Sequence, residues 1–371
     1  MTDFMFCLAK PFLHALDPED AHKVTILSLK TGVMPRQRRI DDPRLRMTLW
    51  NLAFENPVGI AAGFDKNAEV IGPMFDMGAG FAEAGTVTPK PQAGNPKPRL
   101  FRNPGTRAVI NRMGFPNQGV DVFKRNLERF YARPAARSRG LVGLNIGMNK
   151  DQANPVEDYC LLVRELAPYA DYFAVNISSP NTPGLRDMQT RETFLKLTEQ
   201  ILAQRAKSCP SEKLPPVLVK LAPDLTEAQQ EDLAGAALES GVEGLILTNT
   251  TLDRPETLPE DFRKETGGLS GEPLTQKSTD IIRNFYDLTH GKLPIMGVGG
   301  ISSAQDAYDK IRAGASVLQL YSALVFQGPE LIKKINTGLL DFLERDGFKH
   351  LSEAVGADHA QASRSQKRAA E

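Results

Sequence analysis

Short apolar runs recur eight times along this chain, and segments of helical character separate most of them. Each run holds four to eight residues and is almost continuously apolar, which is typical of strands that are covered on both faces. Strands that alternate with helices pair in parallel, because a helical crossover returns the chain to the same end of the sheet. The runs span residues 58–62, 80–87, 141–146, 172–177, 217–221, 244–247, 294–298 and 317–320.

Eight such repeats predict an α/β fold, the closed (β/α)8 or TIM barrel. The alternative is an open, doubly wound sheet, which normally carries a Gly-x-Gly-x-x-Gly fingerprint after its first strand. After the run 58–62 the chain reads Gly63-Phe64-Asp65-Lys66 instead, and the glycine-rich segment 297–302 ends in a serine. The dinucleotide fingerprint is therefore absent, which favours the barrel.

Two of the intervening helices show start and stop signals. The segments 226–229 and 302–305 each pair a Ser or Thr with a Gln three residues later, the pattern of a capping box. Gly241 and Gly314 follow as stop signals. We expect one helix to begin at each box and to end near the glycine.

Residues 1–40 follow a different pattern. Phe4, Leu8 and Phe12 recur at every fourth position, which predicts a helix with one apolar face. Asp17 then has the features of an N-cap that starts a second helix. The resulting helical hairpin either packs on the main domain or dips into a membrane interface, and the pattern alone does not separate these readings.

The remaining boundaries follow from composition. Alternating apolar residues predict a small β-hairpin over 45–54, and the barrel domain is expected over 41–347. Residues 348–371 are rich in small, polar and charged side chains, which predicts a disordered tail. No run of 18 apolar residues exists, so no spanning helix is expected, and the start lacks the features of a signal peptide.

Charge and cysteine content exclude several classes of protein. Lys plus Arg and Asp plus Glu both number 45, so no net basic field points to nucleic acid. The three cysteines lie too far apart for a zinc motif, and none of the five histidines falls at a strand end. These absences disfavour a metal site and a histidine base, and they suggest an organic cofactor.

Polar side chains stand at most of the predicted strand ends, where barrels of this kind gather their chemistry. Lysines at two strand ends provide positive charge, and asparagines suit the amide edges of a flat heterocycle. The segment 297–300 lies where such barrels often bind phosphate. Two alternatives stay open at this point: a lyase or aldolase with a Schiff base on Lys220, and a non-catalytic barrel that acts as a membrane adaptor.

Seven motifs, in order, carry a resemblance to a known family. They span residues 61–66, 85–89, 111–115, 176–184, 248–251, 267–271 and 297–300. Together they resemble the dihydroorotate dehydrogenases over about residues 10 to 340. Ser179 stands where the soluble branch of that family has a catalytic cysteine, and the helical hairpin is present. The chain is therefore similar to the class 2, quinone-dependent branch, whose base is a serine.

The resemblance implies a set of site residues and a cofactor, FMN. The implied FMN contacts are Ala62, Gly63, Phe64, Asp65, Lys66, Thr86, Asn145, Asn176, Lys220, Thr248, Gly271, Gly300, Tyr321 and Ser322. The implied dihydroorotate contacts are Lys66, Asn111, Arg112, Met113, Gly114, Phe115, Asn176, Asn181, Asn249 and Thr250. The implied quinone contacts are His22, Arg102 and Tyr321.

The resemblance also implies the reaction. Dihydroorotate is oxidised to orotate, a step of pyrimidine (UMP) biosynthesis, when Ser179 takes a proton from C5 and C6 delivers hydride to FMN. Lys220 would stabilise the reduced flavin, and a membrane quinone would accept the electrons. We expect a monomer that is peripheral to the cytoplasmic side of the cell membrane and binds neither metal nor nucleic acid.

Overall fold

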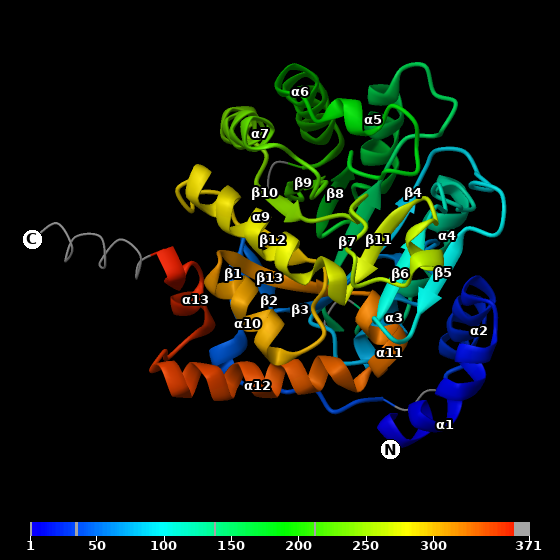
Figure 1. The fold of residues 1–371 in the computed structure, drawn as a ribbon. Helices are drawn as coiled ribbons and strands as arrows, with labels where there is room; N and C mark the ends of the chain where they lie inside the picture. Colours follow the sequence, from blue (N-terminus) through cyan, green and yellow to red (C-terminus); the bar gives the residue numbers. More distant parts are fainter. Residues whose placement is uncertain (1, 34–35, 137–138, 211–212, 360–371) are drawn as a thin grey trace, which may run out of the picture.

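The computed structural model describes residues 2–33, 36–136, 139–210 and 213–359. Eight parallel strands close into a barrel, as predicted, and each of the eight apolar runs forms one of them (Figure 1). In chain order these strands are β3 (Val58–Asp65), β4 (Phe81–Val87), β7 (Leu141–Ile146), β8 (Tyr172–Asn176), β9 (Val217–Leu221), β10 (Gly244–Leu247), β12 (Ile295–Val298) and β13 (Ala315–Leu320). Strand β13 pairs with β3 and so closes the ring.

Helices pack around the barrel and bury the outer faces of the strands (Figure 1). They are α3 (Ile71–Asp76), α4 (Val120–Tyr131), α5 (Pro155–Leu166), α6 (Arg191–Ser208), α7 (Glu227–Ser240), α9 (Thr275–Leu288), α10 (Ala304–Arg312), α11 (Ser322–Gln327) and α12 (Glu330–Asp346), with the short α8 (Glu260–Arg263). Helix α7 confirms its predicted start and stop. Thr226 and Gln229 form the capping box, and Gly241 adopts the left-handed conformation at the other end.

The second predicted capping box was wrong by one residue. Ser303, and not Ser302, is the N-cap of α10, and its side chain accepts the backbone N–H of Asp306 at 3.1 Å. The Ser302 hydroxyl instead donates to the Asp306 carboxylate at 2.9 Å. Gln305 bonds along the helix and does not reach back to the cap. Ser302 and Ser303 are adjacent and either could cap the helix. Because the Ser302 hydroxyl bonds to the Asp306 carboxylate, Ser303 is the residue that caps the backbone.

A small sheet that the periodicity did not predict covers one end of the barrel. Strands β5 (Leu100–Asn103), β6 (Ala108–Asn111) and β11 (Gly268–Gly271) form an antiparallel sheet of three strands. Its own small core includes Ile110 and Leu269. Four-residue strands whose partners lie far apart in the chain leave no periodic signal, so this sheet went undetected.

The predicted β-hairpin closes the opposite end. Strands β1 (Met47–Leu49) and β2 (Leu52–Phe54) pair antiparallel, as expected for 45–54. Trp50 in the turn donates its indole N–H to the carbonyl of Glu243 at 2.6 Å, directly before β10 begins. The hairpin therefore covers the amino ends of the barrel strands and leaves their carboxyl ends to the site.

The first two helices lie at the side of the barrel, beside β5 (Figure 1). These are α1 (Thr2–Ala15) and α2 (Pro18–Lys30), and Asp17 caps α2 as predicted by accepting two backbone N–H groups. The almost fully buried pair of Glu19 and Arg99, with N···O distances of 3.0 and 2.8 Å, fastens α2 to the barrel domain.

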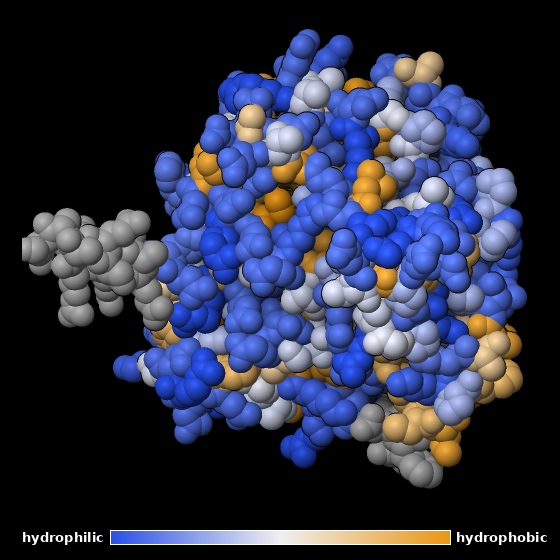
Figure 2. Space-filling view, viewed as in Figure 1, coloured by the Kyte–Doolittle hydropathy of each residue, from blue (hydrophilic) through white to orange (hydrophobic). Residues whose placement is uncertain are grey.

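The outer surface of this helical pair is apolar. Figure 2 shows hydrophobic side chains gathered over the region where Figure 1 places α1 and α2. Leu8, Phe12, Leu27 and Val33 are each at least 60% exposed. The side chain of Phe4, the first residue of the predicted stripe, lies outside the described residues. Within the described ranges, no helix has both the length and the apolar character needed to cross a bilayer.

The predicted disordered tail begins too early. Helix α13 (Leu351–Ala354) lies within it, and Leu351 and Ala354 are fully buried. Arg312 forms an ion pair of 2.8 Å with Asp358. Leu351 and Ala354 anchor the segment to the barrel, although the average composition of 348–371 is polar. Residues 360–371 lie outside the described part of the chain.

Candidate active site

A cavity of about 580 Å³ opens at the carboxyl ends of the barrel strands. Asn176 and Lys220 line its inner end, and it continues without a break to the space between α1 and α2. There Phe6, Leu13 and Leu29 line it, so the cavity is polar at the barrel and apolar at the helices. The described residues contain no cluster of His, Cys, Asp and Glu side chains that could hold a metal ion.

Buried amides and hydroxyls form the polar end of the cavity. Thr86 donates to Asn145 at 2.6 Å, and Asn176 donates to Thr86 at 3.0 Å. Beneath them Glu83, which is fully buried, accepts bonds from Asn145 at 2.8 Å and from Gln319 at 2.7 Å. Each side chain fixes the next, so the groups that face the cavity are rigidly oriented before any ligand binds.

Two lysines bring positive charge into this site. Burial lowers the pKa of Lys220, while the charge of Glu83 acts in the opposite direction. Among the described residues, none forms an ion pair with Lys220. Lys66 donates to the carbonyl of Gly63 at 2.6 Å, and burial lowers its pKa to about 8. Both lysines can therefore respond electrostatically to a negative ligand.

Ser179 lies on the loop that follows β8. Its hydroxyl is almost completely buried, lines the cavity and accepts the backbone N–H of Asn181 at 3.2 Å. The side chain of Asn181 donates to Asn111 at 3.2 Å, which ties this loop to the small sheet. Within the described chain, no histidine or carboxylate hydrogen-bonds to Ser179, so its hydroxyl has no partner of the kind that activates a triad serine.

Several groups in the cavity are built for a polar ligand. The hydroxyls of Thr248 and Thr250 and the amide oxygen of Gln319 are buried without a hydrogen-bond partner in the protein. Gly300 has a φ of +71°, and a Cβ there would lie 2.3 Å from the Thr275 hydroxyl. Thr275 therefore occupies the space that a side chain at position 300 would need, and the glycine backbone after β12 lines the cavity, where a helix N-terminus or a glycine loop can bind phosphate.

The three predicted quinone contacts lie in the same cavity. His22 and Tyr321 surround Phe64, with ring centroids 5.9 and 5.8 Å from it. Burial and the charge of Lys66 lower the pKa of His22 well below its usual value, so its imidazole is neutral. Arg102 donates to the carbonyl of His14 at 2.8 Å and so binds the carboxyl end of α1.

Most of the predicted site residues converge on this one cavity. Its lining includes His22, Ala62, Gly63, Phe64, Lys66, Thr86, Arg102, Asn111, Met113, Gly114, Phe115, Asn176, Ser179, Asn181, Lys220, Thr248, Asn249, Thr250, Gly271, Gly300, Tyr321 and Ser322. Asp65, Arg112 and Asn145 do not line it. Asn145 lies one layer below, in the buried network of Glu83.

The other two exceptions have structural contacts. The Asp65 carboxylate accepts the backbone N–H groups of Glu69 and Val70 at 2.8 and 2.7 Å and so shapes the turn after β3. Burial raises the pKa of Asp65 to about 6. The Arg112 side chain points away from the cavity, stacks on the ring of Phe101 and forms an ion pair with Glu265 at 2.6 Å.

Among the residues that sequence reasoning missed are Gln319, which lines the cavity, and Ser178, which is buried beside Ser179. Gln319 lies within an apolar run and is the polar residue of that run, which is the signal that could have identified it. Ser178 was passed over beside Ser179, yet its hydroxyl accepts a bond of 2.9 Å from Asn249.

Comparison with known proteins decides the family. The model of the family described as "Dihydroorotate dehydrogenase" matches residues 44–343 of this chain. The chain belongs to the dihydroorotate dehydrogenase family. The match covers the whole barrel, and the class 2 resemblance is confirmed by relatives that are named dihydroorotate dehydrogenase (quinone).

Two bacterial relatives and one solved structure show how far the similarity extends. A dihydroorotate dehydrogenase (quinone) of Rhodospirillum rubrum is 50% identical over 97% of this chain and 96% of its own. That of Parvibaculum lavamentivorans is 51% identical over 95% of this chain and 99% of its own. The crystal structure of the family member from Eimeria tenella in complex with ferulenol superposes with a TM-score of 0.88 at 40% identity, and covers 92% of this chain and 96% of its own.

Proposed function

We propose that this chain oxidises dihydroorotate to orotate and reduces a quinone, as a step of pyrimidine (UMP) biosynthesis. The observation that carries the proposal is the continuous cavity, which joins a polar barrel end containing Ser179 and Lys220 to an apolar space between α1 and α2. A polar substrate and an apolar acceptor can therefore reach one buried centre from different sides.

The residues around the centre fit FMN. Gly300 and Ser322 would hold the phosphate, and Thr248, Asn176 and Lys220 would meet the polar edge of the ring. Bound FMN supplies a flat ring that accepts a hydride from the substrate. The Thr248 hydroxyl supports this assignment, because it is buried without a hydrogen-bond partner from the protein, and so does the backbone at Gly300, which lines the cavity.

The substrate would lie against the asparagines above the ring. Asn111, Asn181 and Asn249 present both donors and acceptors, which match the ring amides of dihydroorotate. The Lys66 ammonium provides a charge for the substrate or the cofactor. The side chain of Arg112 points outward, so only its backbone can take part.

Ser179 would remove the proton. In the reaction the C5–H and C6–H bonds would break and a C5=C6 double bond would form. The serine oxygen would take the C5 proton while its own hydroxyl proton passes to water, and the hydrogen of C6 would pass as a hydride to bound FMN. The two electrons and two protons finally reduce the quinone to a quinol. Burial of Ser179 keeps bulk water from the reacting carbons.

The helical pair would bring this chemistry to a membrane. Its exposed Leu8, Phe12 and Leu27 suit shallow insertion into the lipid interface. His22, Arg102 and Tyr321 would contact the quinone headgroup within the cavity. We further propose a monomer bound at the cytoplasmic side of the cell membrane.

An acceptor panel tests this function. Purified holoprotein is given dihydroorotate with a short-chain quinone, with nicotinamide dinucleotide or with fumarate, and orotate is measured by its ultraviolet absorbance. We expect orotate with the quinone alone, because the apolar arm of the cavity admits no charged acceptor. Orotate formation with either of the other acceptors, and none with quinone, would contradict the proposal.

A further inference from the structure

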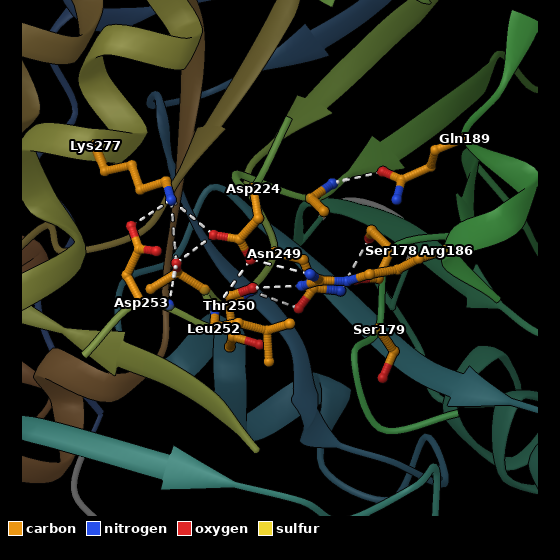
Figure 3. A network of polar contacts seen from close by, with 12 residues as sticks. Ser178, Ser179, Arg186, Gln189, Asp224, Asn249, Thr250, Leu252, Asp253 and Lys277 are labelled. Atoms are coloured by element: carbon orange, nitrogen blue, oxygen red, sulfur yellow. Dashed lines mark hydrogen bonds and ion pairs between the residues drawn. The ribbon is translucent and has the colours of Figure 1, made fainter. Parts of the chain in front are cut away.

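A cluster of three charged side chains lies next to the loops of the site (Figure 3). Arg186 belongs to a short 3-10 helix (Arg186–Met188) after β8, Asp224 follows β9, and Lys277 lies on α9. None of the three lines the cavity. The functional residues described above do not include them, although they sit directly behind the loops that do.

Arg186 contacts the backbone on both sides of the site. Its Nε donates to the carbonyl of Ser178 at 3.1 Å, and its Nη2 donates to the carbonyl of Thr250 at 3.0 Å. Ser178 directly precedes Ser179, and Thr250 directly follows Asn249. One planar guanidinium thus spans the loop of the proposed base and the loop of the proposed substrate contacts (Figure 3).

Asp224 holds the guanidinium in place. It accepts a bond of 2.9 Å from Nη1 of Arg186 and one of 2.7 Å from Lys277. The hydroxyl of Thr251 and the backbone N–H of Leu252 also donate to it, at 2.5 and 2.9 Å. Burial opposes ionisation of this carboxyl, but the bonds from Lys277 and Thr251 outweigh it and lower the pKa of Asp224. The carboxylate is therefore a charged anchor with four donors.

The clamped loops also contact each other directly. Asn249, which lines the cavity, donates to the fully buried hydroxyl of Ser178 at 2.9 Å. Ser179 itself points away from the charged cluster (Figure 3). The guanidinium can therefore alter the position of the Ser179 hydroxyl only through the backbone, without contact to the reacting atoms.

We propose that Arg186, anchored by Asp224, is a positioning residue that sets the distance between Ser179 and the substrate held by Asn249 and Thr250. This inference rests on the proposed function. A displacement of about 1 Å of a catalytic group can lower a rate by roughly 10²-fold, so small loop shifts have measurable effects. A lysine at this position keeps the charge but cannot make three bonds in the fixed directions of a guanidinium.

The test uses stopped-flow reduction of the bound flavin by dihydroorotate, with and without deuterium at C5. In Arg186→Lys we expect reduction to slow by about 10- to 100-fold. We also expect a larger C5 isotope effect than in wild type, because transfer of that proton becomes the slower part of the step. Asp224→Asn should also slow flavin reduction and raise the C5 isotope effect, but both changes should be smaller than in Arg186→Lys.

Two further measurements separate positioning from general destabilisation. In Arg186→Ala, added guanidinium ion at a non-denaturing concentration should restore part of the rate and lower the isotope effect, whereas equal ammonium should not. Deuterium exchange into residues 177–188, measured in the protein without substrate, should accelerate in Arg186→Lys. Both follow from loss of the bonds to Ser178 and Thr250.

Arg205→Lys is the matched control. Arg205 also pairs with a carboxylate, Glu243 at 2.7 Å, and donates to a carbonyl, that of Pro215 at 3.0 Å, but at the amino ends of the strands. This variant should lose thermal stability and keep the wild-type isotope effect. An isotope effect in Arg186→Lys equal to that of wild type would overturn the inference. If the wild-type flavin did not bleach with dihydroorotate, the proposed function itself would fail.

Discussion

Ser179, the proposed base, lies in an enclosed site. The hydroxyl accepts one bond, from the backbone of Asn181, and is almost completely buried. Because no charged group among the described residues hydrogen-bonds to it, its proposed reactivity would depend on its position relative to the substrate. The neighbouring contacts of Asn181, Asn111 and Asn249 provide that position.

Replacing Ser179 tests its role as the base. In Ser179→Ala we expect FMN to stay bound and flavin reduction by dihydroorotate to fall by about 10²- to 10⁴-fold, the usual cost of losing a general base. Ser179→Cys should keep some activity, with its pH profile moved upward because a thiol must ionise. Reduction of the Ala variant at the wild-type rate would remove Ser179 from this role. Ser303→Ala, which removes only a helix cap, should reduce at the wild-type rate.

For single residues, the sequence predicted those site residues whose position follows from the order of the barrel strands alone. Asn176 and Lys220 end neighbouring parallel strands, so their side chains had to meet at one end of the barrel. Glu83 and Gln319 could not be assigned in this way, because an apolar run does not say which of its residues point inward. The outward direction of the Arg112 side chain could not be predicted from the sequence either, because it depends on stacking against the ring of Phe101.

Helix α10 shows how one element supports the site from outside. Lys310 is fully buried at its inner face, and its ammonium donates to the Thr275 carbonyl at 3.0 Å and to the Thr279 hydroxyl at 2.8 Å. Thr275 in turn donates to the carbonyl of Gly300 at 2.7 Å. The packing of α9 on α10 therefore holds the glycine backbone that would face the phosphate.

This buried lysine predicts a pH dependence of stability. Burial lowers the pKa of Lys310 to about 7 in the folded chain, while in the unfolded chain it is about 10.4. Between these values the unfolded state binds the extra proton, so the free energy of unfolding rises with pH, by up to about 1.4 kcal/mol per unit. Lys66 and Lys220 have lowered pKa values as well and act in the same direction.

The comparison with Lys310→Met isolates the contribution of this one group. Denaturant unfolding at several pH values should show the wild type gaining stability relative to the variant from about pH 7 to pH 10. A difference that stays constant over this range would show that Lys310 remains charged in the folded protein. Lys292→Met, an exposed lysine on the surface, should leave the pH dependence unchanged.

The helices and strands that were predicted correctly are those whose own residues form a recognisable pattern. The eight barrel strands and the helix α2, with its cap at Asp17, each contain a strong local pattern. The sheet of β5, β6 and β11 depends on pairing between distant segments, and α13 depends on two buried residues in a polar stretch. Such elements are stabilised by tertiary contacts, which a local pattern does not contain.

The whole molecule joins two environments through one cavity. The barrel provides a rigid polar end, and the helical pair provides an apolar end beneath an exposed apolar surface. The buried pair of Glu19 and Arg99 fixes α2 against the barrel, so the two ends keep their alignment. The central claim is that dihydroorotate reacts at the first end and the quinone at the second.

The most direct test times the two half-reactions separately in the variant Thr25→Phe. Thr25 lies on α2 and lines only the helical part of the cavity, so a larger side chain there narrows the apolar arm. Thr31→Phe, at the exposed end of the same helix, is the control. In stopped flow we predict that Thr25→Phe bleaches with dihydroorotate at the wild-type rate but recovers its colour with quinone at least about 10-fold more slowly. Recovery at the wild-type rate in a folded Thr25→Phe protein would contradict the account, because the quinone would then reach the flavin by another route.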